Sequence, residues 1–236
     1  MTFSDKVVLI AGGTGGLGRA VSLAFMNSGA NVIVTYRDQK EFDNLQSEVA
    51  TGKSVTGHPV DVTDEAAVRQ LVESILKDHG RLDVLVNAVG GYAGGVNLWE
   101  VETKTFGLMF ALNVRSGYAL SRAAIPAMLK QKRGVIVNVA SKAAVDHAAG
   151  AGAYAASKAA AVAMMDSLAA EVKGSGVRVN SILPSIIDTA PNRKAMPNAD
   201  FTKWPKPEEI ARVILFLCSD DGKLINGASV PVYGES

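Results

Sequence analysis

The stretch KVVLIAGGTGGLGRAVSLAFMNSG, residues 6–29, decides the fold of this chain. Residues 6–11 form an apolar, β-branched run, which is typical of a strand buried on both faces of a parallel sheet. After a glycine cluster, Leu17, Val21 and Phe25 follow helical spacing, and the helix is predicted to stop at residues 27–29. A strand, a glycine turn and a helix therefore stand in the order of a nucleotide-binding β–α unit.

The glycine turn has the pattern G-x3-G-x-G, formed by Gly12, Gly16 and Gly18. Glycine permits a tight turn and a close approach of the backbone to a pyrophosphate, while the helix N-terminus offers free N–H groups and a positive dipole end. A P-loop is excluded because Arg19-Ala20 stands where Lys and Ser/Thr are required. The turn therefore predicts a dinucleotide site, with a plain structural turn as the alternative.

The second predicted strand, residues 31–36, ends at Arg37-Asp38, about twenty residues past the glycines, where a cofactor ribose is read. An Arg there accommodates the 2′-phosphate of NADP, whereas an acidic residue binds the 2′-hydroxyl of NAD. Arg37 comes first, so NADP(H) is the preferred cofactor. NAD(H) through Asp38 is the alternative.

Strands and helices continue to alternate along the chain. We expect helices at 40–50, at about 65–80, at 103–131, from about 152 to 173 and from residue 207, and strands at 54–60, 82–86, 135–139, 177–183 and 228–232. Short links between them predict an α/β fold with a doubly wound parallel sheet. The carboxyl ends of its strands, and the loops that follow them, then share one edge. No linker or low-complexity segment interrupts residues 1–236, which predicts a single domain.

The segment SKAAVDHAAGAGAYAASK, residues 141–158, carries the candidate chemistry. Tyr154 and Lys158 are four residues apart, so they share a helix face with stems roughly 6 Å apart. A nearby ammonium favours phenolate, so we expect the pKa of Tyr154 to fall from about 10 toward neutrality and the phenol to serve as a general acid or base. Ser141, at the end of a predicted strand, can hydrogen-bond the same substrate oxygen. Asn113, inside an apolar helical setting, needs a polar partner.

Composition excludes several classes of function. The 236 residues carry a formal net charge of +1 with no basic stripe, which speaks against a nucleic-acid partner and a lipid surface. The single cysteine, Cys218, sits in an apolar run and is expected to be a buried small hydrophobe. His58, His79 and His147 lack metal-ligand spacing, so no metal site is expected. We expect a cytoplasmic protein, since the first residues lead straight into a strand and no apolar run is long enough for a membrane span.

Taken together, these motifs resemble the short-chain dehydrogenase/reductases (SDRs) of the compact single-domain type, over essentially the whole chain. The matching features are Gly12-x3-Gly16-x-Gly18, Asp61-Val62, Asn87-Ala88-x-Gly90, Asn113, Ser141, Tyr154-x3-Lys158, Asn180-x3-Pro184 and Thr189. The resemblance implies a Rossmann fold of about seven strands in the order 3-2-1-4-5-6-7, with helices on both faces. It also implies a homotetramer, or else a dimer.

The resemblance implies a catalytic set of Asn113, Ser141, Tyr154 and Lys158. Tyr154 is the acid/base, Ser141 orients the substrate oxygen, Lys158 lowers the tyrosine pKa and holds the nicotinamide ribose, and Asn113 anchors a water in a proton relay. The implied cofactor site comprises Gly12, Thr14, Gly15, Gly16, Leu17, Gly18, Arg37, Asp61, Val62, Asn87, Ala88, Gly90, Tyr154, Lys158, Pro184, Ile187 and Thr189. The sequence departs from the family at Ser185, where Gly is usual, and at Thr14-Gly15, where many NADPH-preferring members carry an Arg.

The expected reaction is hydride transfer between NADP(H) and a carbonyl/alcohol substrate, a ketone or aldehyde reductase. The candidate substrate walls are residues 91–99 and the loop at about 185–206, with Tyr92, Trp99, Met196, Phe201 and Trp204 as either cleft lining or loop packing. A 3-oxoacyl thioester on an acidic carrier, contacted by Arg193, Lys194 and Lys203, is one alternative substrate. A sugar or alcohol oxidised with NAD is another. The alternative from another class is a non-enzymatic redox sensor that binds NADP(H).

Overall fold

The computed structural model describes residues 1–50 and 53–236, and a parallel sheet runs through the middle of them. Its strands are β1 (Val7–Ala11), β2 (Asn31–Tyr36), β3 (Val55–Pro59), β4 (Val84–Asn87), β5 (Gly134–Val139), β6 (Val177–Pro184) and β7 (Ser229–Val232). The seven strands lie in the order β3-β2-β1-β4-β5-β6-β7, and every neighbouring pair is parallel. The fold class and strand order expected from the sequence are confirmed.

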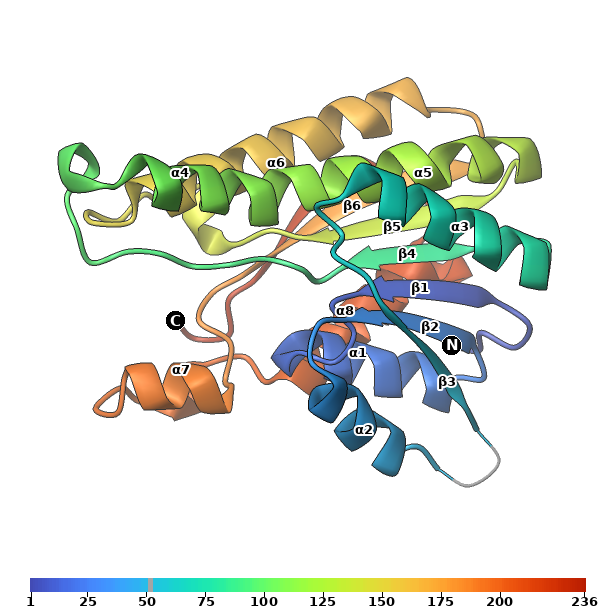
Figure 1. Cartoon of the computed structure of the whole chain (residues 1–236), viewed down its shortest axis with the longest axis horizontal. Helices are drawn as coiled ribbons and strands as arrows, with labels where there is room; N and C mark the ends of the chain where they lie inside the picture. The colour runs from blue at the N-terminus through green and yellow to red at the C-terminus, as the bar shows by residue number, and fades with distance from the viewer. Residues whose placement is uncertain (51–52) are drawn as a thin grey trace.

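Helices cover both faces of the sheet (Figure 1). One face carries α1 (Gly16–Asn27), α2 (Gln39–Ser47) and α8 (Pro207–Cys218), and the other carries α3 (Glu65–His79), α4 (Thr103–Phe110), α5 (Ser116–Gln131) and α6 (Gly152–Glu171). The short helix α7 (Ala190–Ala195) lies apart from the sheet, in the segment that links β6 to α8. This arrangement explains why the central strands β1, β4 and β5 read as largely apolar runs: both of their faces are covered.

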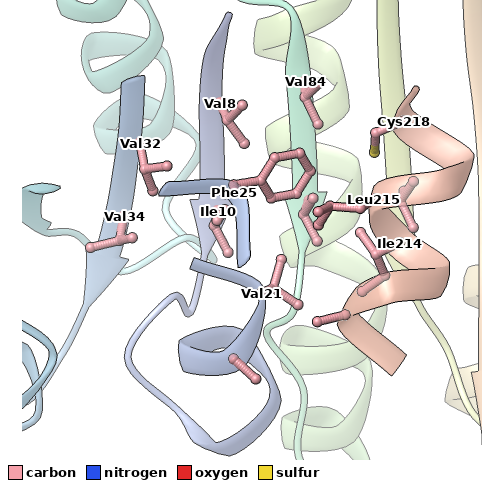
Figure 2. Packing of buried hydrophobic residues seen from close by; sticks show 14 of the residues in the cluster. Val8, Ile10, Val21, Phe25, Val32, Val34, Val84, Ile214, Leu215 and Cys218 are labelled. Carbon is pink, nitrogen blue, oxygen red and sulfur yellow. The ribbon is translucent and has the colours of Figure 1, made fainter. Parts of the chain in front are cut away.

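Two apolar clusters hold these layers together, and β1 contributes to both. Val8 and Ile10 belong to the cluster under α1 and α8, whereas Val7 and Leu9 belong to the cluster under α3, α5 and α6. This alternation follows from the two-residue period of side chains in a strand. Figure 2 shows Phe25 of α1, which is fully buried, among residues of the sheet and of α8.

The long helix expected over 103–131 is interrupted. A π-helical turn at Ala111–Arg115 separates α4 from α5. The turn contains Asn113, whose side chain bonds to Gly91 and to Ser157 of α6. An extra residue in a helical turn redirects the side chains that it carries, and such turns are frequent at functional sites. The partners of Asn113 therefore give a physical reason for the position of the irregularity.

The segment from residue 184 to 206, which was expected to be a loop, contains α7 and a 3₁₀ turn at Phe201–Lys203. Thr189 caps α7 with its side chain, and Pro191 stands in the first turn, where a missing N–H costs nothing. The other elements lie within a few residues of their expected bounds. The single-domain organisation of residues 1–236 remains a prediction.

Candidate active site

The topology gathers the predicted site residues at the carboxyl edge of the sheet. The glycine turn follows β1, Arg37 follows β2, Asp61 follows β3, Ser141 follows β5, and β6 ends at Pro184. Asn87 is the last residue of β4 and opens the loop to Gly90. Tyr154 and Lys158 come from the first turns of α6, which packs against the 3₁₀ turn that begins after Ser141. Residues that are more than a hundred positions apart in the chain thus meet at one edge.

The glycine turn is held by the end of β2 and by α1. The N–H of Gly12 donates to Oγ1 of Thr35 at 3.0 Å, and the N–H of Gly13 donates to the Thr35 carbonyl at 3.2 Å. Gly12 has a φ of 72°, which favours glycine. A side chain on Gly18 would overlap the carbonyl oxygen of Gly12, so α1 can approach the turn only because this position is glycine. The turn is thereby fixed before any ligand arrives.

The N-terminus of α1 is open to an anion. Its N-cap, Gly15, makes no side-chain cap, and its first turn contains no acidic residue. The free N–H groups and the positive end of the helix dipole therefore face the turn without a competing carboxylate from α1. The pyrophosphate of NAD(P)(H) fits this arrangement.

Arg37 and Asp38 have different surroundings at the end of β2. The Asp38 carboxylate accepts from the N–H of Lys40 at 2.8 Å and so caps α2. Arg37 is exposed, and it contributes to lowering the pKa of Asp61, after the larger effect of the hydrogen bonds that Asp61 accepts from Thr63. The structure therefore engages Asp38 in a helix cap, whereas Arg37 remains exposed.

Sequence reasoning did not identify Glu41. Its Oε2 accepts a hydrogen bond from Oγ1 of Thr14 at 3.0 Å, which places a carboxylate at the glycine turn. Glu41 lies in the first turn of a polar helix, where acidic residues are common because they favour the dipole. Its sequence position thus gave no sign of a role beyond that helix.

Asn87 organises the loop after β4. It is buried, its Nδ2 donates to Oδ1 of Asn138 at 3.0 Å, and its Oδ1 accepts from the N–H of Val89 at 3.2 Å. A Cβ on Gly90 would lie 2.9 Å from Oδ1 of Asn113 and 3.1 Å from Nζ of Lys158. A side chain at this position would therefore have to displace the side-chain end of Asn113 or Lys158.

Asn113 has the polar partners that its apolar sequence setting required. Its Oδ1 accepts from the N–H of Gly91, and its Nδ2 donates to the Gly91 carbonyl, both at 3.0 Å, and to Oγ of Ser157 at 2.9 Å. The side chain thus ties the loop after β4 to α6, close to Tyr154. The water-anchoring role that the resemblance implies for Asn113 remains a prediction.

Lys158 is almost completely buried beside this loop. Its Nζ donates to the Val139 carbonyl at 3.0 Å and lies 6.0 Å from the centre of the Tyr154 ring. Burial disfavours the ammonium and lowers the pKa of Lys158 to about 8. The predicted face-sharing of Tyr154 and Lys158 is confirmed, and the lysine is directed to the end of β5.

The expected fall in the pKa of Tyr154 does not occur in the free protein. Burial raises the pKa of Tyr154, Tyr92 raises it further, and only hydrogen bonding with Ser141 lowers it in part. Spacing on a helix placed the lysine near the phenol, but it could not show that the ammonium bonds to a carbonyl and that the phenol is largely shielded from water. The prediction was wrong because desolvation outweighs the neighbouring groups.

The candidate substrate walls divide into two groups. Tyr92 packs edge-on against Tyr154, with ring centres 5.0 Å apart, and Tyr92 and Trp99 are 69% and 83% exposed. Trp204, in contrast, is buried against Phe201. Tyr92 therefore provides an exposed aromatic ring at Tyr154, whereas Phe201 and Trp204 pack the segment between β6 and α8.

Arg193 forms a bidentate ion pair with Asp188, at 2.5 and 2.7 Å, and its guanidinium lies over the Phe201 ring. The Arg193 guanidinium is therefore paired with a carboxylate of its own segment, which was expected to contact an acidic carrier. Lys194 and Lys203 are exposed.

Ser185 replaces a usual glycine for a visible reason. Its Oγ donates to the Tyr233 carbonyl at 2.6 Å and lies 2.7 Å from Oγ of Ser236. It thus fastens residues 233–236 to the turn after β6, and Lys142, next to Ser141, lies over the Tyr233 ring. The departure is visible in the sequence, whereas these partners are not, because they lie about fifty residues away.

Cys218 and His147 lie in surroundings that give them no visible part in the chemistry. Cys218 is buried, and desolvation raises the pKa of its thiol to about 12. His147 lies within hydrogen-bond distance of the Ala144 carbonyl.

Among residues 1–50 and 53–236, no three His, Cys, Asp or Glu side chains gather in a way that could hold a metal ion. In the same described part of the chain, no helix is both long enough and apolar enough to cross a membrane.

Comparisons with known proteins identify the family of the chain. The short chain dehydrogenase family model matches residues 6–200. The chain is 32% identical to the 3-oxoacyl-[acyl-carrier-protein] reductase of Thermotoga maritima, over 99% of this chain and 98% of the relative. It is also 32% identical to meso-2,3-butanediol dehydrogenase of Serratia marcescens, over 99% and 95% of the two chains.

Solved structures with either cofactor resemble the fold. An NAD+-bound xylitol dehydrogenase superposes with a TM-score of 0.91 at 25% identity, covering 99% of this chain and 100% of the other. The NADP-bound protein ElxO superposes with a TM-score of 0.89 at 29% identity, covering 97% of each chain.

The chain belongs to the short-chain dehydrogenase/reductase family. It is an oxidoreductase that uses NAD(P)(H) and acts on CH–OH and C=O groups.

Proposed function

We propose that the chain reduces a ketone or aldehyde with NADP(H), reversibly, and that Tyr154 is the general acid/base. The proposal is carried by one observation: Tyr154, Ser141 and Lys158 lie together beside the loop after β4, at the edge where the glycine turn fits a pyrophosphate.

The nicotinamide supplies the hydride, so the protein has to position the substrate and manage one proton. Ser141 and Tyr154 donate hydrogen bonds to the substrate oxygen, where negative charge develops. Tyr154 then gives its proton to that oxygen in reduction, and takes it back in alcohol oxidation. The raised pKa of Tyr154 keeps the phenol protonated, which suits the direction of reduction.

Lys158 has two roles in this proposal: its ammonium is a donor for the nicotinamide ribose and a positive charge near Tyr154. Its buried setting, with Val139 as the hydrogen-bond acceptor, holds the ammonium in one place. Asn113 fixes Gly91 and Ser157, and so positions both the loop beside the lysine and the turn of α6 that carries Tyr154.

The preference for NADP(H) over NAD(H) is supported by Arg37, since Asp38 is occupied in capping α2. An arginine at the end of the second strand recognises the 2′-phosphate. The absence of an arginine at Thr14 and Gly15 weakens this preference without reversing it. We propose the remaining cofactor contacts at the residues named from the family resemblance.

The exposed ring of Tyr92 beside Tyr154, with Trp99 further along the same loop, suits an apolar or ring-containing carbonyl compound. A 3-oxoacyl thioester is the second candidate, as in the Thermotoga maritima relative; the ion pair of Arg193 with Asp188 leaves Lys194 and Lys203 as the cations for an acidic carrier. An NAD-dependent sugar or alcohol oxidation is the third, as the names of the Serratia marcescens relative and the xylitol dehydrogenase indicate. A cytoplasmic location stays a prediction.

Tyr154→Phe tests the proposal, because it removes the hydroxyl and leaves the ring. We expect kcat to fall by about 10²- to 10⁴-fold with NADPH and a set of ketones, while NADPH affinity changes less than about twofold. Tyr118→Phe, at an exposed tyrosine of α5, is the matched control and should leave kcat unchanged. Unchanged turnover in Tyr154→Phe would remove this residue as the acid/base. NADPH binding without turnover on any carbonyl or alcohol would favour the redox-sensor alternative.

A further inference from the structure

The carboxylate at the glycine turn belongs to Glu41, and the chemistry described above does not use it. Glu41 is exposed, lies in the first turn of α2, and accepts from Oγ1 of the buried Thr14 at 3.0 Å. Thr14 stands between Gly12 and Gly16, inside the turn that fits the pyrophosphate. A fixed negative charge at this position needs an explanation, since the turn otherwise favours anions.

Two contacts locate this carboxylate relative to the adenosine side of a bound cofactor. The backbone of Gly12 and Gly13 is bonded to Thr35, two residues before Arg37, so the end of β2 lies against the turn. Glu41 reaches the same turn from α2, four residues after Arg37. A ribose that is read by residues after β2 while its pyrophosphate lies on the turn must pass between Arg37 and Thr14.

Both charges then lie near the path of that ribose, Arg37 at the end of β2 and the Glu41 carboxylate at the glycine turn. Arg37 attracts a 2′-phosphate, and the Glu41 carboxylate, held by Thr14, repels it. The 2′-hydroxyl of NAD is neutral and is not repelled. The hydrogen bond from Thr14 holds the Glu41 carboxylate at the turn, although both Glu41 and Arg37 are exposed residues.

We propose that Glu41 is a cofactor-specificity residue that opposes the 2′-phosphate and limits the preference that Arg37 creates. The inference rests on the proposed NADP(H) function, since Arg37 is its counterpart. It predicts a protein that discriminates between NADPH and NADH less than Arg37 alone would allow. Removing the charge of Glu41 should therefore widen the discrimination between NADPH and NADH.

Glu41→Gln tests the proposal, since the amide oxygen can still accept from Thr14 while the charge is removed. We expect NADPH affinity, followed by nicotinamide fluorescence, to rise about five- to tenfold, and NADH affinity to change less than about twofold. The gain should shrink at high salt, because a charge at an exposed site is screened. Arg37→Gln should have the opposite effect and lower NADPH affinity. In the double variant, Glu41→Gln should still raise NADPH affinity relative to Arg37→Gln alone.

Glu73→Gln, which removes the same charge from an exposed position on α3, is the matched control and should leave the NADPH/NADH ratio unchanged. An unchanged ratio in Glu41→Gln would overturn the proposal. An equal rise with both cofactors would also overturn it, because the carboxylate would then act on the shared pyrophosphate. If the wild-type protein prefers NADH and Glu41→Gln still shifts the ratio toward NADPH, the role of Glu41 stands while the proposed NADP(H) preference fails.

Discussion

Lys158 shows what the burial of one candidate catalytic residue costs in folding free energy. Its ammonium is buried with one carbonyl as a hydrogen-bond acceptor, and burial holds its pKa near 8, below the ordinary 10.5. Below pH 8 the lysine is protonated in both the folded and the unfolded chain, so the full cost of its desolvation is present. Between pH 8 and 10.5 the unfolded chain binds more protons, so this contribution to folding improves as the pH rises.

Lys158→Met should therefore stabilise the free protein at pH 7. The pKa shift corresponds to about 3 kcal/mol and the lost hydrogen bond offsets about 1 kcal/mol, which leaves about 2 kcal/mol in favour of the variant. The measurement is urea unfolding of both proteins at pH 7 and at pH 9.5. At pH 9.5 the difference between their free energies of unfolding should fall below about 1 kcal/mol. Lys77→Met, at an exposed lysine of α3, should leave stability within about 0.5 kcal/mol at both pH values. A destabilised Lys158→Met at pH 7 would show that the ammonium contributes more through its bond to Val139 than its burial costs.

At the scale of elements, the approach of α1 to β1 depends on one position. Gly18 lies in the first turn of α1, and its Cα faces the carbonyl oxygen of Gly12 with no room for a further atom. Backbone atoms cannot move aside as a flexible side chain can, so an added methyl group has to displace the helix or the turn. The G-x3-G-x-G spacing thus describes helix packing as much as ligand binding.

Gly18→Ala should lower the free energy of unfolding by about 2–4 kcal/mol and weaken the binding of both cofactors, because the displaced helix carries the free N–H groups. Gly15→Ala is the matched control: its φ is −72° and its nearest neighbour, the Gly12 carbonyl, would lie 3.7 Å from the new Cβ. We expect its stability to stay within about 0.5 kcal/mol of the wild-type value in the same urea titration. Equal losses in the two variants would contradict the packing argument.

At the scale of the whole molecule, the face formed by α4, α5 and α6 leaves apolar surface exposed. A hollow of about 430 Å³ lies between α5 and α6 and is lined by Tyr118, Ser121, Arg122, Ile125, Pro126, Met164, Met165, Ser167, Leu168 and Glu171. Phe106 and Leu108 of α4 are exposed as well. Exposed apolar surface of this kind marks interaction sites, and we propose that it joins copies of this chain.

Light scattering should therefore give about four times the chain mass of 24.6 kDa, or twice that mass for the alternative dimer. Leu168→Glu, which places a charge in the hollow, should shift the population to smaller species. Leu224→Glu, at a residue that is 90% exposed and outside the hollow, should not. A wild-type protein that is monomeric throughout the micromolar range would contradict the proposal.

The sequence by itself determined the fold class, the strand order through the family resemblance, and the edge at which the site lies. Those features follow from local periodicity, from turn residues and from the handedness of the connections, all of which are written in consecutive residues. It also identified Tyr154, Ser141, Lys158 and Asn113, because the motif spacing carries their positions.

Only the tertiary structure decided how these groups behave and what else lies beside them. The raised pKa of Tyr154, the bond from Lys158 to Val139, the closure of Ser185 onto residues 233–236 and the carboxylate of Glu41 at the glycine turn all depend on contacts between distant segments. Desolvation and hydrogen-bond partners are properties of the packed neighbourhood, and periodicity along the chain does not encode them.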